Sequence, residues 1–475
     1  MLLRTITSPL TAGSRAHPRS PVATRRLLHA LAPRVVVLGS GWAGFEILRD
    51  LDKRRYDVTV VSPRNYFVFT PLLASTSVGT LEFRCITEPV RSRGDNFKFY
   101  EATADRIDLD NRAVLCSSTV EGVPGQFAIP YDKLVVTVGA RSNTFDIPGV
   151  REHAFFLKDV PDARRIRQRV LDCFEWASQP NVSPAEQSRI LHFAVVGGGP
   201  TGVEFAAELS DFVRDDLRRV YPHLMDRVTL TVYDVAPTLL GTFDRNLAAY
   251  ADARFRRQGI RVRTRTAIAG VTARELILAD QRREPYGLLV WATGLTATPL
   301  VTSLGDRAAH DPRSGRILCD DRLRVLGPDR RTPLPDVFAL GDCATLTNHG
   351  LPATAQVAKQ QGIYLSRVLN RLGRATDWTV DDERPFTYRH LGSMAYLGGW
   401  KAIVDLQKPG APASASKRTT GGNGLRLADY IGEGRLAWLF WRTSYFTMSV
   451  SPKNKILIPV YWFLTWVFGR DISRF

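Results

Sequence analysis

Two stretches of the 475-residue chain decide its fold: VVVLGSGWAGFEILRD at 35–50 and FAVVGGGPTGVEFAAEL at 193–209. Each begins with a short apolar run, which predicts a strand buried on both faces, and continues through a glycine-rich turn into a helix. A GxGxxG turn in this context binds the diphosphate of a dinucleotide. One such turn is weak evidence, but two in one chain predict two dinucleotide sites.

Each glycine of such a turn has its own physical reason. The first permits a tight bend, the second lets the backbone approach a diphosphate, and the third lets the helix pack closely on the strand. The helix N-terminus adds free N–H groups and a partial positive charge for the phosphates. The first turn comprises Gly39, Ser40, Gly41, Trp42, Ala43 and Gly44, and the second comprises Gly197, Gly198, Gly199, Pro200, Thr201 and Gly202.

The residues at the ends of later strands assign a nucleotide to each turn. The strand after the second turn ends at Asp234, where a carboxylate binds a ribose 2′-hydroxyl and repels a 2′-phosphate. We therefore expect NADH there, with a solvated turn residue as the alternative interpretation of Asp234. The first unit has Ser62-Pro63-Arg64 at this place, a weaker ribose signal. We assign FAD to it because a strand ending in Gly341-Asp342 can bring Asp342 to the ribityl chain of a flavin.

Apolar runs alternate with helical stretches over most of the chain, which predicts a parallel α/β architecture. Small residues at two strand ends, Gly139 and Thr293-Gly294, would let the backbone pass close to each nucleotide. We expect an α/β fold of two tandem Rossmann-like domains with a C-terminal region. The expected divisions are a leader at 1–33, a first FAD-binding part at 34–152, an NADH-binding domain at 153–333, a second FAD-binding part at 334–375 and a membrane-associated region at 376–475.

The formal net charge is +17, and part of it lies in the leader. No acid precedes Glu46, and the arginines there alternate with serines and threonines, which is typical of a mitochondrial import sequence. A disordered basic tail is the alternative.

The five cysteines are scattered and never spaced as CxxC, which argues against a disulfide framework, a zinc site and a redox dithiol. We expect each of them to be a small buried hydrophobe.

The C-terminal region is aromatic and apolar. Residues 410–424 are rich in Gly, Ser and Ala and predict a flexible surface loop. Residues 456–468 (ILIPVYWFLTWVF) form an apolar run flanked by Lys453, Lys455 and Arg470. Spanning a bilayer takes about 20 residues, so this run is too short. We expect a helix lying in the membrane interface, with an ordinary core or dimer-interface helix as the alternative.

Several motifs, taken together, resemble one family. The chain is similar to the type II (alternative, rotenone-insensitive) NADH:ubiquinone oxidoreductases of fungal mitochondria, within the two-dinucleotide-binding flavoproteins. The resemblance covers nearly all of 34–475, and its last two motifs are specific. The motifs are SPRNYF at 62–67 with FTPLL at 69–73, VGGGPTGVE at 196–204, AQVAKQQ at 355–361 and FGRDISRF at 468–475.

The resemblance implies an enzyme with non-covalent FAD that passes electrons from NADH to ubiquinone, without pumping protons, at the mitochondrial inner membrane. It implies that Glu204 lies where nicotinamide and flavin meet, and that Gln356 and Gln360 border the flavin and the quinone. Two glutamines four apart share a helix face, although two solvated glutamines are an equal alternative. We expect Glu204 in the first turn of its helix, where an acid is common because it interacts favourably with the helix dipole. This structural role is the alternative to a role in the reaction. The implied FAD site also includes Thr70, Pro71, Leu72 and Ala355.

Departures and alternatives limit these expectations. The family usually has Glu where this chain has Asp234, so strict NADH preference is open. No calcium-loop pattern is present, and no metal is expected. A sulfide:quinone oxidoreductase needs paired cysteines near the flavin, where only Cys343 is a candidate. A flavoprotein resembling apoptosis-inducing factor would use the basic charge to bind nucleic acid or partners. That charge forms no single run, so we expect a membrane surface and no nucleic acid as the partner. The import leader, with no stop-transfer segment after it, favours the matrix side, and a homodimer is left open.

Overall fold

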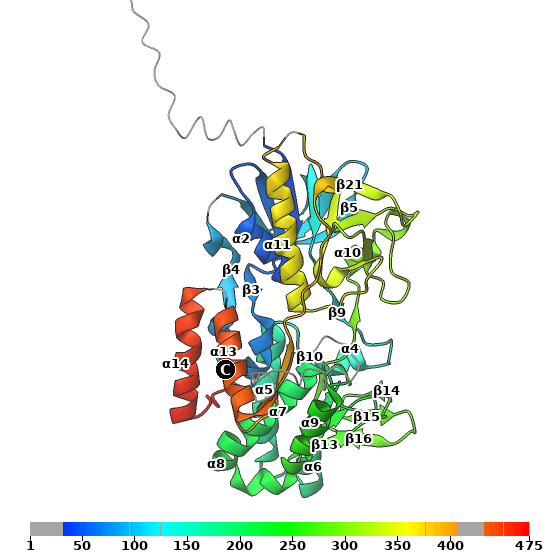
Figure 1. Cartoon of the computed structure of the whole chain (residues 1–475). Coiled ribbons are helices and arrows are strands. Elements are labelled where there is room, and N and C mark those ends of the chain that lie inside the picture. Colours follow the sequence, from blue (N-terminus) through cyan, green and yellow to red (C-terminus); the bar gives the residue numbers. More distant parts are fainter. Residues whose placement is uncertain are drawn as a thin grey trace, which may run out of the picture.

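The computed structural model describes residues 32–94, 96–123, 125–375, 377–406, 432–449 and 451–474. Nearly all of the expected leader, and the Gly-rich loop expected at 410–424, lie outside the described residues. Figure 1 shows an upper lobe that carries α2 and α11, a lower lobe that carries α7 and α9, and the last two helices, α13 and α14, against one side. The last described residues lie beside the lower lobe, where Arg470 pairs with Asp216 and Arg474 with Asp172.

The upper lobe is built on a sheet with the strand order β22-β19-β20-β21-β8-β1-β2-β5-β6-β7 in the described part of the chain. The central strands are parallel, β1 with β2 and β8, and β8 with β21, so their carboxyl ends open on one edge. The strands are β1 (Arg34–Leu38), β2 (Asp57–Ser62), β5 (Lys98–Asp108), β6 (Ala113–Ser118), β7 (Gln126–Pro130), β8 (Lys133–Val136), β19 (Ile317–Cys319), β20 (Arg324–Leu326), β21 (Pro333–Ala339) and β22 (Ala344–Leu346).

Strands β19 and β20 do not lie where the sequence placed them. We expected 153–333 to belong to the second unit, but both strands pair within the first sheet. β20 pairs antiparallel with β21, whose middle lies only about a dozen residues further on, and β19 pairs in parallel with β22. The hairpin forces β20 onto whichever sheet holds β21. The chain therefore returns to the first sheet before β19 rather than at 334.

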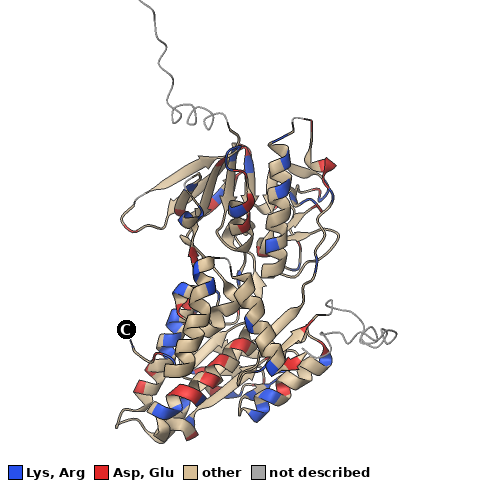
Figure 2. Cartoon of the chain, turned by 60° about the vertical axis from the view of Figure 1, so that its left-hand side comes forward, with Lys and Arg blue, Asp and Glu red and all other residues tan. Residues whose placement is uncertain are grey.

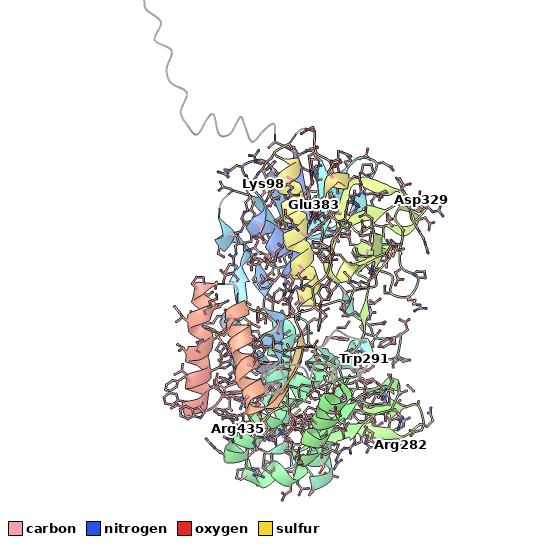
Figure 3. All side chains as sticks on the ribbon, viewed as in Figure 1. Lys98, Arg282, Trp291, Asp329, Glu383 and Arg435 are labelled. Carbon is pink, nitrogen blue, oxygen red and sulfur yellow. The ribbon has the colours of Figure 1, made fainter. Side chains whose placement is uncertain are left out.

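The lower lobe is built on a five-stranded parallel sheet of order β10-β17-β11-β12-β13, and every residue of its central strand is buried. Two short strands that connect the lobes, β9 and β18, pair antiparallel. Trp291, labelled in Figure 3, fastens this connection because its indole Nε1 donates to the Asn143 carbonyl at 2.9 Å. The strands are β9 (Arg141–Ser142), β10 (Phe155–Phe156), β11 (His192–Val196), β12 (Thr229–Tyr233), β13 (Arg261–Arg263), β17 (Leu288–Trp291) and β18 (Leu295–Thr296).

Helices cover both sheets. α11 packs along α2 in the upper lobe (Figure 1), and a Cβ at Gly362 would lie 2.8 Å from the Ala43 carbonyl oxygen, so only glycine permits this close crossing. The principal helices are α2 (Trp42–Asp50), α5 (Val160–Ala177), α6 (Pro184–Ile190), α7 (Pro200–Phe212), α9 (Arg245–Arg257) and α11 (Ala355–Leu372). Shorter elements are α3 (Leu73–Thr76), α4 (Val150–His153), α8 (Arg218–Val220), α10 (Pro299–Thr302), β3 (Tyr66–Val68), β4 (Thr87–Pro89), β14 (Ile268–Val271), β15 (Glu275–Leu278) and β16 (Arg283–Pro285).

The C-terminal module consists of β23 (Ser393–Tyr396), β24 (Ala402–Asp405), β25 (Glu433–Gly434), α13 (Arg435–Met448) and α14 (Pro452–Phe468). α14 begins four residues before the apolar run, because the Ser451 hydroxyl caps it and Pro452 occupies its first position. Ile458 and Trp462, four residues apart, face inward, whereas Phe463 and Trp466 are 59% and 65% exposed. No helix within the described residues is long and apolar enough to cross a bilayer.

The distribution of basic side chains and the burial of the cysteines can both be compared with the sequence. Figure 2 shows Lys and Arg scattered over both lobes rather than gathered in one stripe. All five cysteines are free and buried, as expected of small hydrophobes. Burial raises the pKa of the Cys343 thiol to about 11. The cysteines are therefore packing residues and not reactive thiolates.

Candidate functional site

The first glycine turn is closed at both ends and open in the middle. Gly39 has φ +106°, and a Cβ there would lie 2.5 Å from the Thr137 carbonyl oxygen. A Cβ on Gly44 would overlap the Gly39 carbonyl. Beside Gly41, in contrast, no heavy atom lies within 4 Å of the place of a Cβ. The outer glycines serve packing, while the middle one leaves the backbone accessible at the N-terminus of α2, as a diphosphate requires.

The second turn repeats this geometry at the N-terminus of α7. Gly197 has φ +118° and approaches the Ala292 carbonyl, and a Cβ on Gly202 would overlap the Gly197 carbonyl. Gly199 again has open space where a Cβ would stand. Pro200 and Thr201 form the first turn of α7. Both turns therefore fit a dinucleotide diphosphate by the same test, and they lie on different sheets.

Asp234 lies directly after β12, beside the second turn. Its Oδ2 accepts a hydrogen bond from the Gly198 N–H, and its Oδ1 accepts one from the Ala236 N–H at 2.7 Å. The carboxylate is therefore anchored to the glycine turn by one of its oxygens. A carboxylate offers about four acceptor positions, so two remain for the hydroxyls of a ribose. Thr293 and Gly294 follow β17, and Gly294 takes φ +72° against the Phe145 ring.

The end of β2 closes over the first turn. The Ser62 hydroxyl is buried and lies 2.8 Å from the Ser40 hydroxyl, so its main partner is already within the protein. The Arg64 guanidinium donates to Asp159 at 2.7 Å. Trp42 donates from its indole Nε1 to the Thr70 hydroxyl at 3.0 Å, which joins the turn to the segment containing Pro71 and Leu72. The polar groups of Ser62, Arg64 and Thr70 are therefore bonded within the protein and hold the walls of the first turn in place.

Asp342 lies in a short turn that α11 holds against the first glycine turn. The Gly341 N–H donates to the buried Gln361 side chain at 2.8 Å. A Cβ at Gly341 would lie within 4 Å of both Ala43 and Ala358, so the three backbones lie side by side. The structure thus brings the segment from Ala355, the Gly-Asp turn and the first glycine turn together, as the sequence predicted.

Two cations beside Asp342 were not predicted from the sequence. Burial lowers the pKa of Lys158, and Asp342 opposes that change. Burial also lowers the pKa of Arg316, and Asp342 again opposes it. Arg316 in addition donates to the Gly341 carbonyl at 3.2 Å. The region around Asp342 is therefore cationic, which suits a phosphate-bearing ligand. Neither cation belongs to a local motif that could have revealed it.

Gln356 and Gln360 share one face of α11, and both are tied to the chain that leads to β23. Gln356 Nε2 donates to the Gly392 carbonyl at 2.7 Å, and its Oε1 accepts from the Leu391 N–H at 3.2 Å. Gln360 pairs with both the carbonyl and the N–H of Arg389, at 2.8 and 3.0 Å. They are therefore not two solvated glutamines. Each amide keeps one N–H free for a further acceptor.

Glu204 is buried between α7 and the C-terminal module. The helix begins at Pro200, so Glu204 lies in its second turn and not in the first, which removes the helix-start explanation. One carboxyl oxygen accepts from the Tyr396 N–H at 3.2 Å and from the Trp441 indole at 3.3 Å. Burial raises the pKa of Glu204 to about 8, and the two donors reduce this increase. The group is therefore mainly protonated at neutral pH and can donate a proton.

A row of aromatic rings joins Glu204 to the first turn. The ring centroids lie 5.3 Å apart for Trp42 and Phe69, 6.1 Å for Phe69 and Tyr445, 4.9 Å for Tyr445 and Trp441, and 5.5 Å for Trp441 and Tyr396. Burial raises the pKa of Tyr445 well above its ordinary value. The C-terminal helix α13 therefore completes a water-poor wall between the two nucleotide turns.

The fold and the two turns define a class, and comparison with known proteins agrees. Residues 33–362 match the sequence model of the pyridine nucleotide-disulphide oxidoreductases, and residues 390–471 match the NDH2 C-terminal domain. Both matches include described elements that build the site. The chain is thus a pyridine nucleotide-disulphide oxidoreductase by fold and sequence.

Relatives narrow the class. The chain is 43% identical to the internal alternative NAD(P)H-ubiquinone oxidoreductase A1 of Solanum tuberosum, over 93% of this chain and 88% of that protein. It is 38% identical to the external alternative NADH-ubiquinone oxidoreductase of Yarrowia lipolytica, over 93% and 80%. The NDH2 of Plasmodium falciparum, solved with NADH, has a TM-score of 0.82 at 27% identity, over 93% and 99%. The chain belongs to the family of alternative NAD(P)H-ubiquinone oxidoreductases.

Proposed function

We propose that this protein is an FAD-dependent NADH:ubiquinone oxidoreductase that does not pump protons. The observation that carries the proposal is the repeated open glycine turn, once on each sheet, with a buried acid and two glutamines between the turns and the C-terminal module. The names of the relatives support NADH as donor and ubiquinone as acceptor. The solved relative that is described in complex with NADH supports NADH as the donor, and the anchored carboxylate of Asp234 supports the second turn as its site.

The residues of the upper lobe fit non-covalent FAD. The turn at Gly39–Gly44 would hold the diphosphate, and Asp342 would accept hydrogen bonds from the ribityl hydroxyls. Gly139 lies after β8 with open space where a Cβ would stand, so backbone and ligand can approach closely there. FAD held by these residues would supply the two-electron redox chemistry between NADH and the quinone. The chain's part is to hold both partners in register and to exclude water.

The two glutamines and the buried acid have separate proposed roles. Gln356 and Gln360 hold the chain at 389–392 in place and direct their remaining N–H groups towards the carbonyl oxygens of flavin or quinone. Glu204, protonated at neutral pH, would supply a proton where quinone reduction consumes one. It also ties α7, which carries the NADH turn, to α13, so the donor and acceptor sides share one rigid contact.

NADH specificity and domain division are part of the same proposal. Asp234 would bind the 2′-hydroxyl of NADH and repel the 2′-phosphate of NADPH. Its short side chain is already anchored by two backbone N–H groups, so its position is defined. We retain 34–152 and 334–375 as the FAD-binding parts and 376–475 as the membrane-associated region, with β19 and β20 added to the first part.

The location is proposed from the leader and the exposed helix face. Relatives named mitochondrial include both internal and external enzymes, and the internal relative shares the higher identity of the two compared above. We propose the matrix face of the inner membrane, with α13 and α14 in contact with the lipid, and these helices as the surface of any homodimer. Protection of the protein from protease in intact mitoplasts tests the face: digestion without lysis would place it outside.

Steady-state kinetics of the purified, FAD-loaded protein test the function. NADH should be oxidised with a short-chain ubiquinone as acceptor, and NADPH should be used far less well. Ferricyanide is the control acceptor, because it takes electrons from a reduced flavin without a quinone site. Oxidation with ferricyanide but with no quinone would refute the acceptor. No observation favours sulfide:quinone chemistry, since the Cys343 thiol is buried and bonded to backbone carbonyls.

A further inference from the structure

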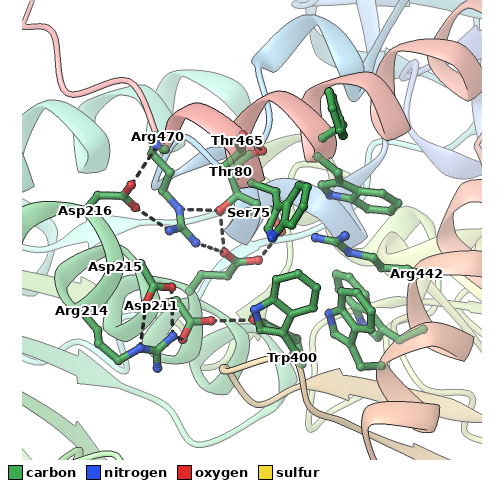
Figure 4. Close-up of a pocket in the computed structure, with 18 of the residues that line it drawn as sticks. Ser75, Thr80, Asp211, Arg214, Asp215, Asp216, Trp400, Arg442, Thr465 and Arg470 are labelled. Atoms are coloured by element: carbon green, nitrogen blue, oxygen red, sulfur yellow. Dashed lines mark hydrogen bonds and ion pairs between the residues drawn. The ribbon is translucent and has the colours of Figure 1, made fainter.

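A cavity of about 700 Å³ lies between the C-terminal helices and the far end of α7 (Figure 4). Glu208 and Asp211 of α7 line it, one and two turns beyond Glu204, so it is directed away from the glycine turns. Its wall combines charged side chains with tryptophans from α13 and α14. Its size is in the range of small-molecule sites. Tyr396 and Trp441, which donate to Glu204, also line it, but no proposed step of the electron transfer takes place in it.

The carboxylates of this cavity are already satisfied by the protein. Glu208 accepts from the Ser75 hydroxyl at 2.6 Å and from the Thr80 hydroxyl at 2.7 Å. Arg470 forms an ion pair with Asp216 at 2.7 Å, both side chains being 9% exposed, and it reaches Glu208 at 3.6 Å. Figure 4 shows these groups joined in one network on the left of the cavity. This part of the wall needs no cation from outside.

The remaining acids are paired in the same way. Asp211 accepts from the Tyr396 hydroxyl at 2.6 Å and forms an ion pair with Arg214 at 2.6 Å. Arg214 also pairs with Asp215 at 2.8 Å. Each carboxylate of the wall thus has a cation or hydroxyl partner. The wall does not favour a cationic ligand.

Arg442 on α13 differs from the other cations. No ion pair of Arg442 with a carboxylate is found among the described residues, and its guanidinium lies between the rings of Trp438 and Trp462, at 4.4 and 4.2 Å. Its Nε is buried without a hydrogen-bond partner. Burial lowers its pKa to about 10, so it stays charged at neutral pH. Glu208 attracts this cation, but Glu208 is already bonded to Ser75, Thr80 and Arg470. A desolvated cation that shares its counterion is costly, and a bound anion would offset that cost.

The outside of the cavity is apolar and the chain around it is basic. Phe463 and Trp466 line the cavity and are strongly exposed, and the neighbouring Val467 and Phe468 are 48% and 78% exposed. Residues 432–474 contain six Lys or Arg and two Asp or Glu. Tryptophan with basic residues is typical of the membrane interface, where anionic lipids attract cations. Arg219, exposed on α8, also lines the cavity.

We propose that this cavity binds the phosphate of an anionic phospholipid, with Arg442 as its principal cation and the acyl chains along the exposed face of α14. Arg presents parallel N–H donors that match phosphate oxygens, and the two flanking indoles keep it from turning away. The adjoining apolar face favours a lipid over free phosphate. The inference rests on the membrane location proposed above and gives the membrane contact a defined headgroup site.

Binding of a monomeric short-chain phosphatidylglycerol to the FAD-loaded full chain tests this, with tryptophan fluorescence as the readout and inorganic phosphate as the comparison ligand. Below its micelle concentration this lipid presents no charged surface, so only a site can bind it. Arg442→Gln should weaken binding about tenfold or more, as loss of a charge-assisted pair does. Lys455→Gln, which removes one exposed charge of α14 outside the cavity, should change it less than about twofold. Arg442→Lys should retain part of the binding.

The rate of NADH oxidation by ferricyanide should be unchanged in all three variants, which shows that they are folded. If Arg442→Gln does not fold, Arg219→Gln takes its place, because that side chain is exposed; we expect about a threefold loss. Equal losses in Arg442→Gln and Lys455→Gln, or no loss in Arg442→Gln, would overturn the site. If inorganic phosphate binds as tightly as the lipid, the lipid assignment is wrong and the ligand is the free ion. Absence of ubiquinone reduction would overturn the proposed function while leaving the lipid titration interpretable.

Discussion

Replacing Glu204 by glutamine should remove a pH dependence of stability that its burial imposes. The carboxyl is enclosed by Tyr396 and Trp441, and burial raises its pKa from the ordinary 4.5 to about 8. Glutamine has nearly the same shape and can still accept from both donors. The substitution therefore changes the titration of the site while conserving its packing and hydrogen bonds.

The sign and size follow from proton linkage. Below pH 4.5 the folded and unfolded states both carry the proton. Between pH 4.5 and 8 only the folded state holds it, so the free energy of unfolding of the wild type falls as the pH rises. A displacement from 4.5 to about 8 corresponds to about 5 kcal/mol as an upper limit, because the protein can relax around the charge. The variant lacks this loss, so its advantage should grow with pH and be complete above pH 8.

Thermal unfolding of the FAD-loaded protein measures this difference. The transition is monitored by the rise in flavin fluorescence as FAD is released. The Tm of Glu204→Gln relative to wild type should increase by about 5 °C or more between pH 4.5 and pH 9. Glu186→Gln is the matched control: its hydrogen bond from Arg189 lowers the pKa of Glu186, so any effect is lost as the pH falls and has the opposite sign. Parallel Tm curves for wild type and Glu204→Gln over this range would refute the assignment.

Four further substitutions test the nucleotide and quinone sites. Gly41→Ala should fold but bind less flavin per protein, because its Cβ would occupy only the space for the diphosphate. Gly44→Ala should instead lower Tm strongly, because its Cβ would overlap backbone atoms. Equal flavin content in Gly41→Ala and wild type would contradict this. Asp234→Ala should raise the KM for NADH about tenfold with little change in kcat, as measured by steady-state kinetics, and an unchanged KM would exclude the ribose contact. Gln356→Ala should slow quinone reduction more than flavin reduction in stopped-flow traces; equal losses would count against a role at the quinone.

Much of the fold could be predicted from local pattern. The two glycine turns specify their own contacts, since Gly39 with Gly44 and Gly197 with Gly202 close each turn within six residues. Strand and helix order followed from the apolar runs. The membership of β19 and β20 did not, because a three-residue buried strand carries no sign of which sheet it joins. Only the pairing of β20 with β21 settles it.

The candidate site was predictable only where its residues belong to motifs. Gln356, Gln360 and Glu204 were identified through such motifs, but their partners were not, because Tyr396, Trp441 and Arg389 lie far away in the sequence. Arg442 directly follows an apolar run, and this pattern alone does not indicate where its side chain lies. In the structure the side chain lies between two indoles. Packing between residues that are distant in the sequence determines these environments. Such contacts cannot be predicted from local patterns in one sequence.

The central claim is that one chain carries electrons from NADH to ubiquinone through a bound flavin. Anaerobic double-mixing stopped flow tests it most directly: the FAD-loaded protein is first mixed with one equivalent of NADH and then with a short-chain ubiquinone. The account predicts that NADH bleaches the flavin absorbance and that ubiquinone restores it at a rate no slower than steady-state turnover. A flavin that NADH reduces but ubiquinone leaves reduced would contradict the account.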